Sequence, residues 1–259
     1  MIDLELFNTT VETLFKGFGM SVYIGLWGIV LSLFIGLSLA LMRQSHSRIL
    51  RSFAFSYSTV FRGTPLLVQL FLLYYGVGTL SFVKDSPTLW WLFSDGMRCA
   101  ILAIGLNSGA YVSEVFRGGF QAVPVGQIEA AKSIGMSAWM RFRRVAFPLA
   151  IRQALPAYSN EIVLAIKGTS LASTIAVMDL TGHAKRLMNQ NYAIIETFVI
   201  AGLLYLLINF TLLSVVHLVE RWLKVRSGRC RSSNRLRSSA PCRQPTYRSG
   251  ARLAAAKSM

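Results

Sequence analysis

Long stretches without any charged residue constrain this chain more than any other feature of its sequence. Three such stretches occupy residues 18–42, 63–83 and 197–219. A helix that crosses a bilayer needs about 20 predominantly apolar residues, and each of these stretches supplies them. Two further candidates, at 98–116 and 159–178, are apolar but contain ionisable residues. We therefore predict an all-α integral membrane protein with five transmembrane helices.

These five spans divide the chain into three parts. Residues 1–17 form a short N-terminal segment, and residues 18–222 form the transmembrane domain. The tail at 223–259 has nine basic residues and no acid from residue 226 onward, so we expect it to be disordered. Its composition departs from that of the rest of the chain, which leaves a native tail and a reading-frame change near Ser227 as alternatives.

The charge of the loops predicts the orientation of the chain. The loop at 43–62 carries four arginines and no acid, and the loop at 117–152 carries six basic residues against Glu129. Loops enriched in Lys and Arg stay on the cytoplasmic side. We therefore place both loops and the C-terminus in the cytoplasm, and the N-terminus in the periplasm. The same topology explains the net charge of +16, so the partner expected from charge is membrane lipid and not nucleic acid.

The segment at 124–148, within the second basic loop, contains a distinctively spaced set of residues. The set consists of Glu129, Ala130, Ala131, Gly135, Val145, Phe147 and Pro148. We expect a helix from Pro124 that ends where Gly135 adopts a positive φ. Ser137 is placed to cap a second short helix. The segment is therefore predicted to be a cytoplasmic helix–Gly–helix loop.

The spacing of this set resembles the EAA loop of ABC-importer permeases. The family consensus ends in Ile-x-Leu-Pro, where this chain has Val145, Phe147 and Pro148. Other segments are similar to the polar amino-acid branch of that family, namely those at 61–66, 74–76, 107–111, 157–161 and 167–173. The resemblance covers roughly residues 10–222 and implies the fold of a type I ABC-importer permease.

The resemblance also implies a function and a set of partners. The chain would be a permease subunit of an ATP-driven, binding-protein-dependent importer in the bacterial inner membrane. Two ATPase subunits would dock at 129–147, beside a second permease subunit, identical or related, and a periplasmic solute-binding protein. The implied substrates are polar amino acids, with basic amino acids or opines such as octopine and nopaline favoured. The alternatives are an uncoupled channel, a scaffold subunit or an integral-membrane enzyme.

Polar residues within the spans are the candidates for a translocation path. They are Asn107, Glu161, Lys167, Thr169 and Ser170. An ionisable group inside a membrane is costly unless it faces water or a partner. Each of these residues has a second interpretation, in which it only bonds to a neighbouring helix. Glu114 and Arg117, three residues apart near the end of the third span, are predicted to form a local ion pair.

No pattern for catalysis or for a cofactor occurs in the sequence. The phosphate-binding pattern G-x-x-x-x-G-K-[ST] is absent, so we assign ATP hydrolysis to a separate subunit and expect no enzyme activity in this chain. The three cysteines and three histidines lack metal-ligand spacing, so we expect no cofactor and no metal site.

Overall fold

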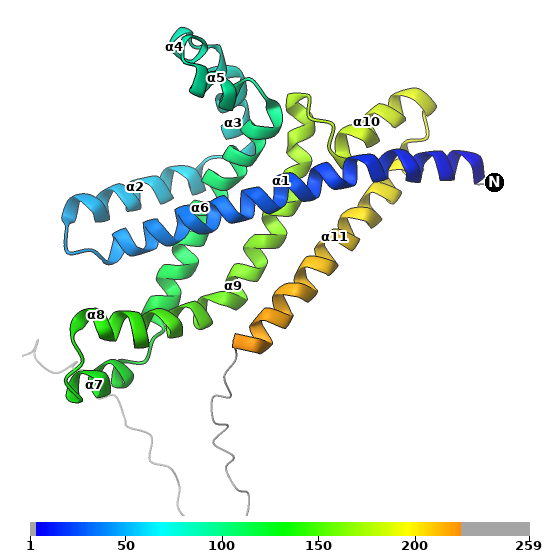
Figure 1. The fold of residues 1–259 in the computed structure, drawn as a ribbon. Coiled ribbons are helices and arrows are strands. Elements are labelled where there is room, and N and C mark those ends of the chain that lie inside the picture. Colours follow the sequence, from blue (N-terminus) through cyan, green and yellow to red (C-terminus); the bar gives the residue numbers. More distant parts are fainter. Residues whose placement is uncertain (1–3, 224–259) are drawn as a thin grey trace, which may run out of the picture. The chain divides into compact units, whose positions relative to one another are not determined.

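The computed structural model describes residues 4–223, and these residues form helices and connections without any strand. The prediction of an all-α fold is thus confirmed. The elements are α1 (Leu4–Gln44), α2 (Arg48–Gly63), α3 (Leu66–Phe71), the π-helix η1 (Leu72–Gly76), the 3₁₀ turn η2 (Val77–Thr79), α4 (Ser81–Asp85), α5 (Pro87–Phe93), α6 (Gly96–Gln121), α7 (Val125–Ser133), α8 (Ala138–Arg141), the π-helix η3 (Phe142–Ala146), α9 (Phe147–Gly168), the 3₁₀ helix η4 (Thr169–Ile175), α10 (Leu180–Asn191) and α11 (Ile194–Leu223) (Figure 1). The predicted basic tail lies outside the described residues.

Three helices in the described range are long and apolar enough to cross a membrane, namely α1, α6 and α11. Two bent pairs pass the same test when each is taken as one unit. The first joins 48–63 to 66–79 with a bend of 103°, and the second joins 138–175 to 180–191 with a bend of 50°. The expected five spans are reached when each bent pair counts as one span.

The sharp bend after α2 is caused by Pro65. Thr64, the residue before it, has extended backbone angles (φ −113°, ψ 141°), as expected for a residue that precedes proline. The side chain of Gln69 crosses the break, where its Nε2 donates to the carbonyl oxygens of Phe61 at 2.9 Å and Thr64 at 3.2 Å. These bonds satisfy backbone groups that the interrupted helix leaves without partners.

Residues 48–63 are helical, although the sequence indicated only a basic loop there. Helix α2 packs against α6 through small and polar side chains. The hydroxyls of Ser58 and Ser113 lie 2.9 Å apart, and Tyr57 donates to the carbonyl oxygen of Leu106 at 3.0 Å. A hydropathy argument misses this helix because its buried face is made of such residues and not of large apolar ones.

Helices α1 and α6 form the central contact of the described part of the chain. Glycines on each helix receive branched side chains of the other. Gly105 and Gly109 of α6 face Leu31 and Ile35 of α1, and Gly28 and Gly36 of α1 face Ile104 and Val112 of α6. A Cβ atom at Gly36 would lie 2.5 Å from Val112 Cγ1, so this approach requires glycine. The spacing of Gly105 and Gly109 matches the G-x-x-x-G pattern of close membrane helices.

The other helices are arranged around this pair. Helix α9 packs on α6, where a Cβ atom at Gly119 would lie 2.6 Å from the carbonyl oxygen of Ala150. The buried Asp179 caps the N-terminus of α10, where its Oδ1 accepts from the backbone nitrogen of Gly182 at 2.8 Å. The Oδ2 atom of Asp179 accepts from the hydroxyl of Tyr205 on α11 at 3.1 Å. This carboxylate therefore joins α10 to α11.

Replacing Gly109 with alanine tests the central contact. The new Cβ atom would lie 2.8 Å from Ile35 Cγ2, so we expect a loss of about 1–3 kcal/mol from overpacking. The matched control is Gly118→Ala on the same helix, where no atom lies within 4 Å of the added carbon. Thermal unfolding of the purified protein in detergent measures both changes. Combining Gly109→Ala with Ile35→Ala should destabilise by less than the sum of the two single effects. Equal stability of the two glycine variants would contradict this account.

Candidate functional site

The segment between α6 and α9 folds as a pair of short helices with a glycine between them (Figure 1). Helix α7 ends in a Schellman motif, in which Gly135 N donates to Lys132 O at 3.0 Å and Met136 N donates to Ala131 O at 3.2 Å. Gly135 has a φ of +78°, which favours glycine. Ser137 caps α8, because its Oγ accepts from Met140 N at 3.3 Å. The predicted local structure of the helix–Gly–helix loop is thus confirmed.

This loop exposes large apolar side chains together with part of the EAA set. Glu129 and Ala130 are exposed, whereas Ala131 is buried. Val125, Ile134 and Trp139 are exposed to 69%, 73% and 69%. Exposed apolar groups on a short, capped helical element are typical of a surface that another protein covers. The motif had indicated Glu129 and the alanines, but Ile134 and Trp139 were not recognised.

The last residues of the EAA set attach the loop to the helical bundle. Phe147 lies with Phe120 of α6 and Phe142 of η3 in an aromatic cluster, with ring centroids 5.9 to 6.3 Å apart. Trp139 of α8 stacks on Phe142 at 5.9 Å. Pro148 lies in the first turn of α9, and Val145 is half-buried in η3. The loop is therefore connected to α6 by contacts between aromatic rings.

Glu114 of α6 is the acidic centre of an ion-pair cluster. Its Oε2 lies 2.7 Å from Arg117 Nε, which confirms the predicted local pair. Its Oε1 contacts Arg43 Nη1 of α1 and lies 3.9 Å from Arg62 Nη1 of α2. The sequence did not reveal these two pairings, because they join residues 71 and 52 positions apart. One carboxylate thus connects three helices.

The five candidate path residues occupy two places in the fold. Asn107 of α6 donates to the carbonyl oxygen of Phe61 and to Gln69 Oε1, both at 3.1 Å. It therefore provides hydrogen bonds to the chain at the break between α2 and α3. Thr169 is fully buried and donates to the carbonyl oxygen of Ile166. The Ser170 hydroxyl donates to the carbonyl oxygen of Lys167 at 2.8 Å. Glu161 is half-buried on α9, and the Lys167 side chain is exposed.

Several apolar spans and one capped, projecting helical loop define a class of protein. It is a multi-pass membrane protein with a capped helical loop that exposes large apolar side chains. The family model described as "Binding-protein-dependent transport system inner membrane component" matches residues 11–225. The chain belongs to this family. It is a multi-pass permease component of an ABC importer in the inner membrane, in a family whose ATPase is a separate subunit and which works with a substrate-binding protein.

Named relatives and a solved structure agree with this assignment. The nopaline transport system permease protein NocM of Agrobacterium fabrum is 44% identical over 222 residues, which cover 86% of this chain and 92% of that protein. The histidine/lysine/arginine/ornithine permease HisM of Salmonella typhimurium is 38% identical over 81% of this chain and 90% of its own length. The crystal structure of an amino acid ABC transporter with histidines has a TM-score of 0.74 and 32% identity, covering 86% of this chain and 99% of that one.

Replacing Glu114 tests the ion-pair cluster. Glu114→Gln keeps the shape of the side chain but leaves Arg43, Arg62 and Arg117 without their shared negative charge. We expect a loss of about 2 kcal/mol, below the value for a fully buried pair because the Glu114 side chain is 19% exposed. Thermal unfolding of the purified protein measures it. The control is Glu12→Gln, since Glu12 forms an exposed pair with Lys16 at 3.6 Å and should contribute under about 0.5 kcal/mol. Equal losses would show that the cluster adds no stability.

Proposed function

We propose that this permease imports a basic amino acid or an opine, driven by two ATPase subunits that dock on the helix–Gly–helix loop. The capped loop with its exposed apolar residues carries this proposal. The substrate class is supported by the relatives, whose names refer to nopaline, octopine, arginine, and histidine with lysine, arginine and ornithine. The loop itself carries no information about the substrate.

The loop is suited to transmit force because a Schellman motif and a serine cap fix its two helices, and because aromatic rings connect it to α6. A partner that grips Ile134 and Trp139 displaces α7 and α8 together, since the Schellman motif and the Ser137 cap fix both helices. The stacked rings of Phe142 and Phe120 pass this displacement to α6. Closure of an ATPase dimer would thereby bias the spans toward one of two states, provided that the ATPase binds the two states with different affinity.

The basic loops suggest the orientation of the assembled importer. We place the helix–Gly–helix loop and the C-terminus in the cytoplasm and the N-terminus in the periplasm. A second permease subunit, identical or related, completes the passage, and a periplasmic binding protein delivers substrate to it. An uncoupled channel would have no use for a capped loop with exposed apolar residues, and membership of a transport-system family favours an importer over a scaffold, so coupling is the better-supported function.

Lys167 is the candidate for contact with a substrate carboxylate. The hydroxyls of Thr169 and Ser170 bond to their own helix, and Asn107 supports the break after α2, so helix bonding accounts for these residues. Lys167 is an exposed residue of α9. A cation at that depth is costly unless it faces water or an anionic partner.

Substituting Gly135 tests coupling through backbone geometry. Gly135→Val forces a β-branched residue to φ +78°, which should distort the end of α7 and misalign α8. We expect uptake of labelled arginine or octopine and substrate-stimulated ATP hydrolysis to fall at least tenfold in the complete complex. The control is Gly135→Asn, because asparagine tolerates this conformation and should keep most activity.

A second loop variant tests docking of the ATPase, and a competition assay tests the substrate class. Glu129→Lys leaves the fold intact, because Glu129 is exposed, and it should also reduce uptake if the loop binds the ATPase. In the unmodified complex, unlabelled nopaline and histidine should compete with labelled arginine, and leucine should not. Full coupled activity in both the Gly135→Val and the Glu129→Lys complexes would contradict docking at this loop. Competition by leucine alone would contradict the substrate class.

Substituting Lys167 tests the substrate path. Lys167→Met removes the charge and should raise the KM for uptake at least tenfold, since losing one charge-assisted hydrogen bond costs about 1.5–3 kcal/mol and about 1.4 kcal/mol is a factor of ten. Lys167→Arg keeps the charge and should stay closer to the unmodified protein. Both are measured as initial uptake rates at matched amounts of assembled complex. An unchanged KM in the Met variant would assign Lys167 to a structural role.

A further inference from the structure

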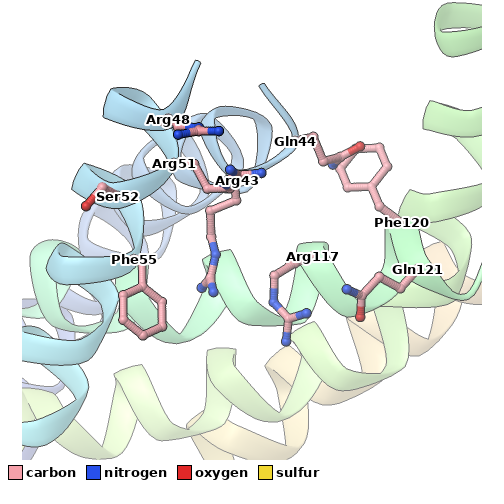
Figure 2. A pocket seen from close by; sticks show the side chains of 9 residues that line it. All are labelled: Arg43, Gln44, Arg48, Arg51, Ser52, Phe55, Arg117, Phe120 and Gln121. Carbon is pink, nitrogen blue, oxygen red and sulfur yellow. The ribbon is translucent and has the colours of Figure 1, made fainter. Parts of the chain in front are cut away.

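A basic cavity of about 700 Å³ lies between α1 and α2 on one side and α6 on the other. Figure 2 shows side chains of α2 and of α6 on opposite sides of this space, with those of the end of α1 beside them. Its charged lining residues are Arg43, Arg48, Arg51 and Arg117. Two phenylalanines and three uncharged polar side chains complete the lining, and none of the lining residues is acidic.

The arginines of this cavity are not balanced by the carboxylates around them. Arg43 and Arg117 share Glu114 with Arg62, so that one negative charge serves three cations. Arg48 and Arg51 are exposed and form no ion pair among the described residues. Like charges held close together repel one another, and an anion that enters the cavity removes this repulsion. Arginine forks are also well suited to bind the oxygens of a phosphate.

We propose that this cavity binds a phosphate-bearing anion, and that its occupant is the headgroup of an acidic phospholipid. Basic pockets between transmembrane helices are typical sites for such headgroups. The apolar surface next to the cavity favours a lipid over a free anion. Ile49, Leu50 and Phe53 alternate with the arginines in the first turns of α2 and are exposed to 81%, 41% and 58%. They would contact acyl chains while the arginines hold the headgroup.

The cavity also touches the element to which we assign coupling. Phe120 lines the cavity and belongs to the aromatic cluster with Phe142 and Phe147. A headgroup beside Phe120 would thus restrict the ring that connects the helix–Gly–helix loop to α6. Lipid binding itself does not depend on the proposed transport function, whereas an effect of the bound lipid on coupling through Phe120 rests on that function.

Native mass spectrometry of the complete complex tests the binding. Detergent-purified complex is exchanged into phosphatidylglycerol or into phosphatidylcholine, and the bound lipid per permease chain is counted. We expect the unmodified complex to retain phosphatidylglycerol and not phosphatidylcholine. The Arg48→Gln/Arg51→Gln variant should retain at least fivefold less phosphatidylglycerol per permease chain than the unmodified complex. The control variant Arg152→Gln/Arg186→Gln removes two exposed arginines outside the cavity and should retain lipid normally.

Three outcomes would overturn the proposal. Equal retention of the two lipids, or equal loss in the two double variants, would show that no specific headgroup site exists. Binding of inorganic phosphate by the complex in phosphatidylcholine, undiminished by added phosphatidylglycerol, would assign the cavity to a soluble anion instead. All values are counted per assembled complex, separated by size, so a variant that fails to assemble is replaced by the single variants Arg48→Gln and Arg51→Gln.

ATP hydrolysis in vesicles tests the connection to the loop. Rates stimulated by binding protein are compared between phosphatidylcholine vesicles with and without phosphatidylglycerol. We expect the unmodified complex to respond to phosphatidylglycerol by at least twofold and the Arg48→Gln/Arg51→Gln complex to respond less. If both respond equally while lipid retention differs as expected, the cavity is a lipid site without influence on coupling. If the binding protein does not stimulate ATP hydrolysis by the unmodified complex in either kind of vesicle, the result would instead count against the proposed function.

Discussion

The mutual packing of α1 and α6 is the contact on which the rest of the structure depends. Burial of apolar surface drives helices together weakly in lipid, because the lipid tails are as apolar as the side chains they replace. Close van der Waals contact must supply the attraction, and glycine is the residue that permits it. Here the branched side chains of each helix enter the glycine positions of the other. This arrangement fixes both the distance between the helices and their register along their axes.

The register of α1 against α6 positions the polar groups at the end of α6. It brings Arg43 to Glu114, and the same carboxylate then reaches Arg62 at the end of α2. Beyond Glu114, α6 carries Phe120, which meets the rings of η3 and α9. A displacement of the helix–Gly–helix loop therefore acts on a helix that is packed tightly against α1. A loosely packed α6 would absorb the displacement locally, whereas a tightly packed one moves with its neighbour.

Sequence reasoning succeeded where the structure depends on local chemistry. Apolar length predicted the helical class, and Gly135 and Ser137 behave as their residue types require. It failed where partners are distant in the chain. Helix α2 was interpreted as a loop because its buried face is small and polar, and the pairing of Arg43 with Glu114 needs the fold to be known. The exposure of Ile134 and Trp139 was not foreseen, since a helical repeat shows which residues share a face but not whether the fold covers that face.

The interrupted span after α2 shows why polar residues inside a membrane cannot be assigned from their position alone. Asn107 appeared to be a path residue because it is polar and lies within a span. In the structure its amide donates to Phe61 and Gln69, where Pro65 has broken the helix and left carbonyl groups to be satisfied. Non-helical backbone at membrane depth persists only where protein or water covers it. The side chains of Asn107 and Gln69 provide that cover. Their polar groups are therefore explained by hydrogen bonds to the backbone at the break, without a role in the translocation path. The side chains of Lys167 and Glu161 have no such task among the described hydrogen bonds and ion pairs, which is the physical reason to separate these two residues from Asn107, Thr169 and Ser170.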